Sequence, residues 1–280
     1  MMYRLPLGQW VNNGVEWLLK KFGNAFDAFT DSVTNITELI RDGVGLVPWF
    51  VIILIFALLA WRAKGWRLAL GTTVGLVIIY NLELWIPFLD TLILVLIASF
   101  VSLIIGIPLG ILAARSDGFH KVFSPVLDFM QTMPSFVYLI PALMFFNLGT
   151  VSAVFATVIF SMPPVIRLTD LGIRQVPTDL VEVGEAFGSS ASQMLWKIQL
   201  PLALPTIMAG INQTMMLSLS MVVISAMIGA QGLGAGVLAG ISQMDIGKGF
   251  EYGLAVVILA MILDRLSQGV ARNSRTAVKK

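Results

Sequence analysis

Long apolar stretches dominate the chain, and most of them are long enough to cross a membrane as a helix. A helix needs about 20 residues to span a hydrocarbon core of about 30 Å. Seven stretches reach or approach that length, so the sequence predicts an all-α polytopic membrane protein with about seven transmembrane helices. These stretches cover residues 45–61, 67–85, 89–114, 122–147, 150–171, 202–228 and 250–266.

Three prolines interrupt the fourth stretch, residues 122–147. Pro125, Pro134 and Pro141 each lack a backbone N–H, so they predict kinks in this span. Inside a membrane, the backbone groups freed at a kink must be satisfied by neighbouring groups or by a water-lined cavity. The same stretch carries Asp128, the most deeply embedded acid, which we expect to pair with a nearby base such as Arg167 rather than to touch substrate.

Paired glycines indicate where helices approach each other closely. Gly71-x-x-x-Gly75 and Gly106-x-x-x-Gly110 each place two small residues on one helix face. A third glycine-rich run, residues 232–236, superficially resembles a nucleotide-binding fingerprint. Because it follows a membrane span and not a strand, we interpret it as a loop or re-entrant turn on the outer side.

The first part of the chain has a different pattern, with apolar residues every three or four positions and charged residues between them. This period predicts an amphipathic helix, broken near Gly23, that is too charged to span lipid. Trp10 and Trp17 suit an interfacial position, so residues 1–43 are expected to lie along the membrane surface. A soluble helix packed on a partner is the alternative. The apolar positions are Val11, Val15, Leu18, Phe22, Phe26, Phe29, Val33, Ile36 and Ile40.

Composition supports the membrane interpretation and excludes several classes of site. Of 280 residues, 57% are hydrophobic and 12% are charged, and the mean hydropathy is +0.88. The absence of cysteine excludes disulfides, and a single histidine, His120, excludes a histidine metal cluster and a serine-protease triad. We expect His120 to be a solvated residue in a short turn. A net charge of +2 with dispersed bases does not favour nucleic acid, and no phosphate-binding loop is present.

The distribution of lysine and arginine predicts the orientation. Placing the C-terminus in the cytoplasm puts thirteen of the eighteen basic residues inside, including Arg62, Lys64 and Arg67. The N-terminus is then outside, and the polar stretch at residues 178–201 is cytoplasmic. The chain would divide into an extracellular-side interfacial helix (1–43), two accessory spans (44–88), a core (89–270) and a basic cytoplasmic tail (271–280).

The polar stretch between the fifth and sixth spans has the signals of two short helices. Thr178 is expected to cap the first helix, and Gly188 to end it, because glycine tolerates the left-handed conformation that closes helices. Ser190 with Gln193 is a capping-box pattern that begins the second, and Pro201 is expected to open the sixth span. The resulting knob would expose Val183, Ala186 and Phe187 to a soluble partner. A structured loop without special function is the alternative.

The same stretch resembles the cytoplasmic "EAA" loop of bacterial ABC-importer permeases. The resemblance rests on an acid, a glycine six residues later, and Ile-x-Leu-Pro after nine more residues. Val183 and Gly184 stand where that family has two alanines. The resemblance implies that the loop couples the permease to an ATPase subunit through Glu182, Val183, Gly184, Ala186, Gly188, Ile198, Leu200 and Pro201.

A closer resemblance covers residues 130–176. The strings QTMPSFVYLIPALMFFNLG and MPPVIRLTDLGIRQVP are similar to permeases for glycine betaine, proline betaine and other quaternary-amine compatible solutes. The resemblance implies a five-helix type I importer core in a bacterial cytoplasmic membrane. It also implies a second copy of the permease, two ATPase subunits and a separate, tethered binding protein. ATP and Mg²⁺ would bind to the ATPase, and this chain would carry no cofactor, no metal and no catalytic residue.

Polar and aromatic residues near the predicted kinks are candidates for the translocation pathway, because polar groups in a span usually face the bundle interior. Aromatic faces could attract a quaternary cation by cation–π interaction. Helix–helix hydrogen bonding is the alternative for each residue. The candidates are Gln131, Thr132, Ser135, Phe136, Tyr138, Asn212, Met216 and Ser220.

Two other classes of function compete with an ABC permease. A secondary transporter would show repeated architecture and ionisable groups at mid-membrane, neither of which is evident. An intramembrane enzyme would need catalytic groups, which we do not find. An ABC permease for another small amine or amino acid also remains open.

Overall fold

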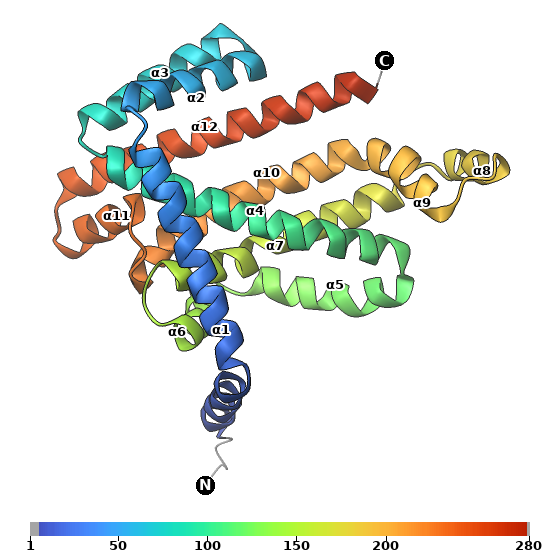
Figure 1. The fold of residues 1–280 in the computed structure, drawn as a ribbon, viewed down its shortest axis with the longest axis horizontal. Coiled ribbons are helices and arrows are strands. Elements are labelled where there is room, and N and C mark those ends of the chain that lie inside the picture. Colours follow the sequence, from blue (N-terminus) through green and yellow to red (C-terminus); the bar gives the residue numbers. More distant parts are fainter. Residues whose placement is uncertain (1–5, 279–280) are drawn as a thin grey trace.

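Helices make up all the regular structure of the part of the chain that the computed structural model describes, residues 6–278, with side chains described for 6 and 8–269 (Figure 1). This confirms the all-α prediction. The basic side chains predicted for the tail, residues 271–280, lie outside the described residues. The helices are α1 (Leu7–Gly45), α2 (Trp49–Lys64), α3 (Trp66–Asn81), α4 (Trp85–Arg115), α5 (Asp117–Thr132), η1 (Ser135–Tyr138), α6 (Leu139–Phe146), α7 (Thr150–Arg174), α8 (Thr178–Ala186), α9 (Ala191–Gln193), η2 (Met194–Gln199), α10 (Leu200–Ile224), η3 (Ser225–Ile228), α11 (Leu233–Ser242) and α12 (Ile246–Val278).

Four long apolar helices form the centre of the molecule and run roughly along one direction in Figure 1. They are α4, α7, the continuous helix Ala191–Ile228 that contains α10, and the Ile246–Gly269 part of α12. Two further spans are counted only if each strongly bent helix pair crosses the membrane as one unit. By length and composition the described residues therefore hold four to six spans, and the predicted number of seven is not confirmed. The helices α2 and α3 have 16 residues each, or about 24 Å.

The prediction that the fourth stretch forms a single kinked helix is wrong. Residues 117–146 form α5 and then η1 with α6, and the two parts are bent by 109°. The break falls at Met133 and Pro134, because a proline lacks the N–H that would continue the helix and pushes the preceding residue into an extended conformation. Pro125 lies within α5 without ending it, and Pro141 lies in the first turn of α6, where a missing N–H is tolerated.

The glycine pair on α4 determines how closely α4 packs against α7. A Cβ added to Gly106 would lie 2.5 Å from Val165 Cγ1, and one added to Gly110 would lie 2.7 Å from the Ile166 carbonyl oxygen. The predicted close approach is confirmed here. Hydroxyl groups join the same interface, because Ser102 and Ser161 lie 3.0 Å apart between their Oγ atoms.

The second glycine pair behaves differently at its two positions. Gly75 of α3 meets α12, since an added Cβ would lie 2.7 Å from Ile258 Cγ2, whereas Gly71 has open space around it. The structure also shows the conformation of the glycine-rich run after η3. Gly234 and Gly236 belong to helix α11 and not to a loop, and the N–H of Leu233 donates to Thr91 Oγ1 on α4 at 2.8 Å.

The helix α1 runs across the bundle, as Figure 1 shows, and is bent by 100° relative to α2. Non-helical dihedral angles at Phe22 break it, next to the predicted break at Gly23. Phe26 and Phe29 of its second half pack against Phe146 and Phe155, while its first half extends beyond the bundle. The stretch is helical, as the apolar period predicts. Its role as an amphipathic helix on a membrane surface stays a prediction.

Replacing Gly110 by alanine tests the α4–α7 contact. The new methyl group would collide with Ile166 oxygen and with Thr169, so we expect a loss of about 1–3 kcal/mol in the free energy of unfolding. Gly71→Ala is the matched control, because nothing lies within 4 Å of the added atom. Thermal unfolding of the two purified variants measures the difference, and equal unfolding temperatures would contradict this packing.

Candidate coupling site and pathway

The short helix α8 ends in a closed corner at Gly188. Its φ of 75° is left-handed, which glycine adopts without steric cost. The N–H of Gly188 donates to the Glu185 carbonyl at 2.8 Å, and the N–H of Ser189 donates to the Gly184 carbonyl at 3.0 Å. These two bonds are the Schellman arrangement, which satisfies carbonyls left open at a helix end. The prediction that Gly188 ends this helix is confirmed. Thr178 is not the N-cap of α8, because Pro177 holds that position.

The chain turns directly into the next helix after this corner. The N–H of Ser190 donates to Gln193 Oε1 at 2.9 Å, and the N–H of Gln193 donates to Ser190 Oγ at 3.3 Å, so the predicted capping box is confirmed. Helix α10 begins at Leu200, so Pro201 lies in its first turn, as predicted, but no break separates α10 from the preceding helix. The helix is continuous from Ala191 to Ile228, and it widens into the π-helical turn η2 just before Pro201, whose missing N–H removes a regular helical bond.

One face of α8 packs onto this continuous helix. Gly184 is buried, and a Cβ added there would lie 2.6 Å from Met194 Cε and 2.8 Å from Ile198 Cδ1. A side chain at this position would require the ends of Met194 and Ile198 to shift, so glycine allows α8 to lie close to η2. Leu200 packs against a small core formed by Ile173, Leu195, Ala203 and Ile207. Within the Ile-x-Leu-Pro motif, Ile198 thus lies against α8, whereas Leu200 packs on α7 and α10.

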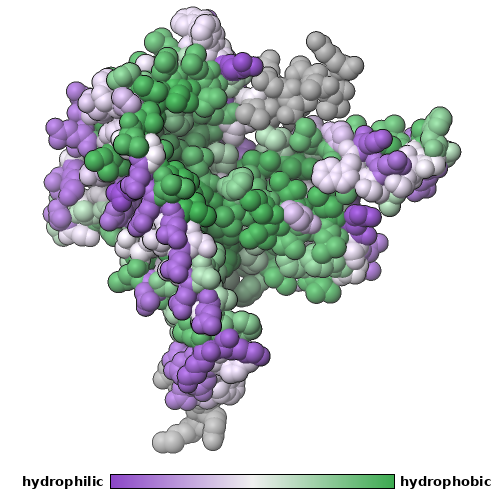
Figure 2. Space-filling model, in the orientation of Figure 1, coloured by the Kyte–Doolittle hydropathy of each residue, from purple (hydrophilic) through white to green (hydrophobic). Residues whose placement is uncertain are grey.

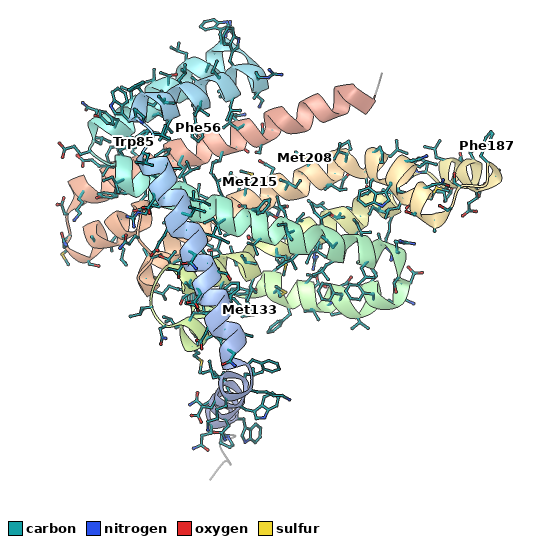
Figure 3. The ribbon with its side chains drawn as sticks, in the orientation of Figure 1. Phe56, Trp85, Met133, Phe187, Met208 and Met215 are labelled. Carbon is teal, nitrogen blue, oxygen red and sulfur yellow. The ribbon has the colours of Figure 1, made fainter. Side chains whose placement is uncertain are left out.

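The other face of α8 is exposed and combines apolar and acidic residues. Val183 is 52% exposed and Phe187 is 87% exposed, and Leu180 extends the same apolar stripe at a spacing of three and four residues. Glu182, Glu185 and Ala186 are also exposed. Phe187 points away from the end of the bundle in Figure 3, and Figure 2 shows apolar and polar surface mixed at this projecting end. Sequence reasoning missed Leu180, although its 180–183–187 spacing gives the signal.

Charged residues join α5 to α7 close to this corner. Arg167 pairs with Asp128, as the sequence predicts. Asp170 lies 2.7 Å from Nδ1 of His120, so the prediction of a solvated turn residue is wrong: His120 lies within α5 and contacts the neighbouring helix. Arg174, at the end of α7, pairs with both Asp117 and Asp170 at 2.7 Å. The sequence did not reveal the His120–Asp170 and Asp117–Arg174 contacts, because they join residues 50 and 57 positions apart.

The candidate pathway residues of the fourth stretch gather at its bend. Gln131, Thr132 and Phe136 are exposed, and Ser135 is half-buried. Tyr138 is only 4% exposed and is held by packing, because its hydroxyl donates to the Met130 carbonyl and its ring meets Phe160 edge-on at 5.6 Å. A contact between Tyr138 and a solute would require its ring to leave this site.

The candidates on α10 also divide by environment. Asn212 contacts α12, since its Nδ2 lies 3.4 Å from Asp264 Oδ1 and its Oδ1 accepts from Ser267. Met216 is half-buried against the core, and Ser220 is exposed with its hydroxyl donating to the Met216 carbonyl at 3.1 Å. For Asn212 the observed contact is helix–helix hydrogen bonding. A pathway role for these residues stays a prediction.

Comparison with known proteins places this geometry in a family. A family model described as "binding-protein-dependent transport system inner membrane component" matches residues 106–278. The glycine betaine transport system permease protein OpuAB of Bacillus subtilis (strain 168) is 48% identical over 267 residues, 95% of each chain. The glycine betaine/carnitine transport permease protein GbuB of Listeria monocytogenes is 49% identical over 97% of this chain and 98% of its own length.

A third relative and a solved structure agree with this assignment. The glycine betaine/proline betaine transport system permease protein ProW of Escherichia coli (strain K12) is 48% identical over 97% of this chain and 77% of its own. A structure of the MetNI methionine ABC transporter in an inward-facing conformation aligns with a TM-score of 0.61. It covers 66% of this chain and 93% of its own chain at 20% identity, which establishes a shared fold. The expected importer-permease fold is therefore confirmed.

Replacing Gly188 by valine tests the corner between α8 and α9. A β-branched residue in the left-handed conformation costs about 1–2 kcal/mol, which corresponds to about 5–30-fold faster opening of the corner. Hydrogen exchange of the Gly188–Ser189 amide region measures this opening. Gly188→Asn is the matched control, because asparagine tolerates positive φ and nothing lies within 4 Å of an added Cβ. Unchanged exchange in Gly188→Val would contradict the described closure.

Proposed function

The chain belongs to the family of binding-protein-dependent transport system inner membrane components, and from this premise we propose that it is the permease subunit of an ATP-driven importer of glycine betaine and related quaternary amines. The near full-length identity of 47–49% to permeases named for glycine betaine carries this proposal. The solute would come from a binding protein and cross the membrane by alternating access.

The exposed face of α8 supports a coupling role in this importer. Helix α8 packs on the bundle through its buried side, and on its other side Glu182, Val183 and the following residue Phe187 form an exposed, projecting edge. Such an edge suits a groove on a soluble ATPase subunit. Energy transfer would require this edge to move as one unit, and the closed corner at Gly188 and the Gly184 contact with η2 provide such stiffness. Glu182, Val183, Gly184, Ala186, Gly188, Ile198, Leu200 and Pro201 would form the coupling element.

The working complex would contain two copies of this chain, two ATPase subunits and a separate, tethered binding protein. ATP and Mg²⁺ would bind at the ATPase, so this chain would bind no cofactor and catalyse no reaction. It would lie in the bacterial cytoplasmic membrane with the N-terminus outside and the C-terminus and α8 inside, in agreement with the distribution of basic residues. Residues 1–43 would lie at the outer membrane surface, residues 44–88 would be accessory, and residues 89–270 would form the permease core.

The pathway would pass the bend between α5 and η1. Gln131, Thr132, Ser135 and Phe136 are accessible there, and the face of Phe136, 58% exposed, suits a quaternary cation. Ser220 on α10 is accessible as well, whereas Tyr138, Asn212 and Met216 would act mainly by supporting the surrounding helices. A secondary transporter remains the rival function, and it would need neither an ATPase nor the exposed edge of α8.

The substrate can be tested with the reconstituted complex of permease, ATPase and binding protein in liposomes. We expect glycine betaine and proline betaine to stimulate ATP hydrolysis and to be taken up, with choline, carnitine and proline compared in the same assay. The control is this chain reconstituted alone, which should transport nothing. Uptake by the chain alone would favour the secondary transporter, and stimulation by none of the betaines would contradict the proposed substrate.

The coupling role can be tested with the two Gly188 variants. Valine at position 188 would strain the corner, so Val183 and Phe187 would no longer be held in position for the groove of the ATPase. We therefore expect Gly188→Val to insert into the membrane normally but to lose solute-stimulated ATP hydrolysis and uptake. Co-purification of the ATPase should fall in parallel. Gly188→Asn should retain both activities, and normal uptake by Gly188→Val would refute the coupling role.

A further inference from the structure

Acidic and basic side chains alternate along the facing sides of α5 and α7. On α5 they are Asp117, His120 and Asp128, spaced so that they share one side of the helix. On α7 they are Arg167, Asp170 and Arg174, which follow one another at intervals of three and four residues. We call these six residues the charge ladder.

Each member of the charge ladder has a partner on the opposite helix. Asp128 pairs with Arg167, His120 Nδ1 lies 2.7 Å from Asp170 Oδ2, and Asp117 Oδ1 lies 2.7 Å from Arg174 Nη1. Ser124 lies between the outer pairs, with its Oγ 3.5 Å from Nε2 of His120. The contacts therefore extend over nearly three turns of α5.

Arg174 joins the ladder to a third helix. Its Nε pairs with Asp170 and its Nη2 donates to the Ala113 carbonyl at 2.7 Å, near the end of α4. One guanidinium thus links the last turn of α4, the first turn of α5 and the last turn of α7. An arginine fork can make several such bonds at once in a fixed geometry.

Apolar packing contributes little to the contact between α5 and α7. Leu127 is the only fully buried residue that the structure describes on α5, although this helix has 16 residues. A cavity of about 290 Å³ lies between the two helices. All the ladder residues except Asp117 line it, together with apolar residues of both helices, namely Phe123, Leu127, Ile166 and Leu171. Because few apolar side chains interlock here, the paired charges are the main specific contacts between these helices.

The ladder lies between two elements with different roles in the proposed function. Three residues separate the end of α7 at Arg174 from the start of the coupling helix α8 at Thr178. The other end of α5 carries Gln131 and Thr132 and leads directly into the bend, after which Ser135 begins η1. Movement at α8 would therefore reach the bend through the ladder, by a shorter route than along the chain.

We propose that the charge ladder makes α5 and α7 one rigid body that transmits displacement of the coupling helix to the bend of the pathway. Its six residues are positioning residues, which touch neither solute nor ATP. The inference rests on the proposed importer function. It differs from a purely structural role because breaking a pair should change the amount of solute moved for each ATP hydrolysed, and not only the yield of folded protein.

Charge reversal at the Asp128–Arg167 pair tests this transmission in the reconstituted complex. Asp128→Arg and Arg167→Asp each place like charges opposite one another, so we expect uptake per ATP hydrolysed to fall by about tenfold, within the usual range of coupling between sites. Combining the two substitutions restores an attractive pair and should return this ratio to within about threefold of the wild type. Lys121→Ala is the control, because it removes an α5 charge for which the structure describes no ion pair.

Two results would overturn the proposal. One is an unchanged uptake ratio in both single variants, and the other is a well-folded double variant without recovery. A wild-type complex that no betaine stimulates would instead contradict the importer function, so the two failures are distinguishable.

The rigid-body claim can be measured directly, and this measurement also decides the question if a reversed single variant does not fold. The chain has no cysteine, so spin labels can be attached at Lys121→Cys and Gln175→Cys, both exposed positions. We expect the same label distance with and without ATP in the otherwise unchanged complex. The distance distribution should broaden in Arg174→Gln, which removes the bond to Asp117. A distance that changes with ATP before that substitution would overturn the proposal.

Discussion

The close contact between α4 and α7 is the constraint on which the rest of the molecule depends. Gly106 and Gly110 have no side chains where α7 passes, so the two backbones approach until a methyl group would collide with Ile166 and Val165. Lipid offers no hydrophobic drive for helix association, so shape fit and hydrogen bonds must hold the spans together. With α7 fixed against α4, α10 packs on the other side through Gly172 and Gly210. The positions of α5 and α8 follow from that of α7.

Local polar chemistry is concentrated where α7 ends. The guanidinium of Arg174 binds three helices there, and the chain begins the exposed helix α8 only four residues later, at Thr178. Arg174 is engaged with other helices, whereas the outer edge of α8 around Phe187 is open. The end of α7 is thus fixed to its neighbouring helices, while the outer side of α8 is open to a partner. An element that transmits movement from a partner to the bundle needs both properties.

Sequence reasoning succeeded where the signal is local and failed where it depends on distant contacts. The corner at Gly188 and the capping box at Ser190 need only neighbouring residues, and both were predictable. The 109° break at Met133–Pro134 was misjudged because a proline that kinks a helix and one that ends it look the same in sequence. Asp170 could not be matched to His120, nor Asn212 to Asp264, without the arrangement of the helices. Asp128 and Arg167 were the exception, since two opposite charges in apolar spans have few other partners.

The absence of a break at Pro201 has a mechanical consequence. From Ala191, next to the coupling corner, to Ile228 the chain is one helix of 38 residues, or about 57 Å. A rod of that length turned by about 5° at one end moves its other end sideways by about 5 Å, roughly the radius of a helix with its side chains. A small rotation at the Ala191 end is therefore amplified into a sideways shift at the Ile228 end, with no helix having to unfold.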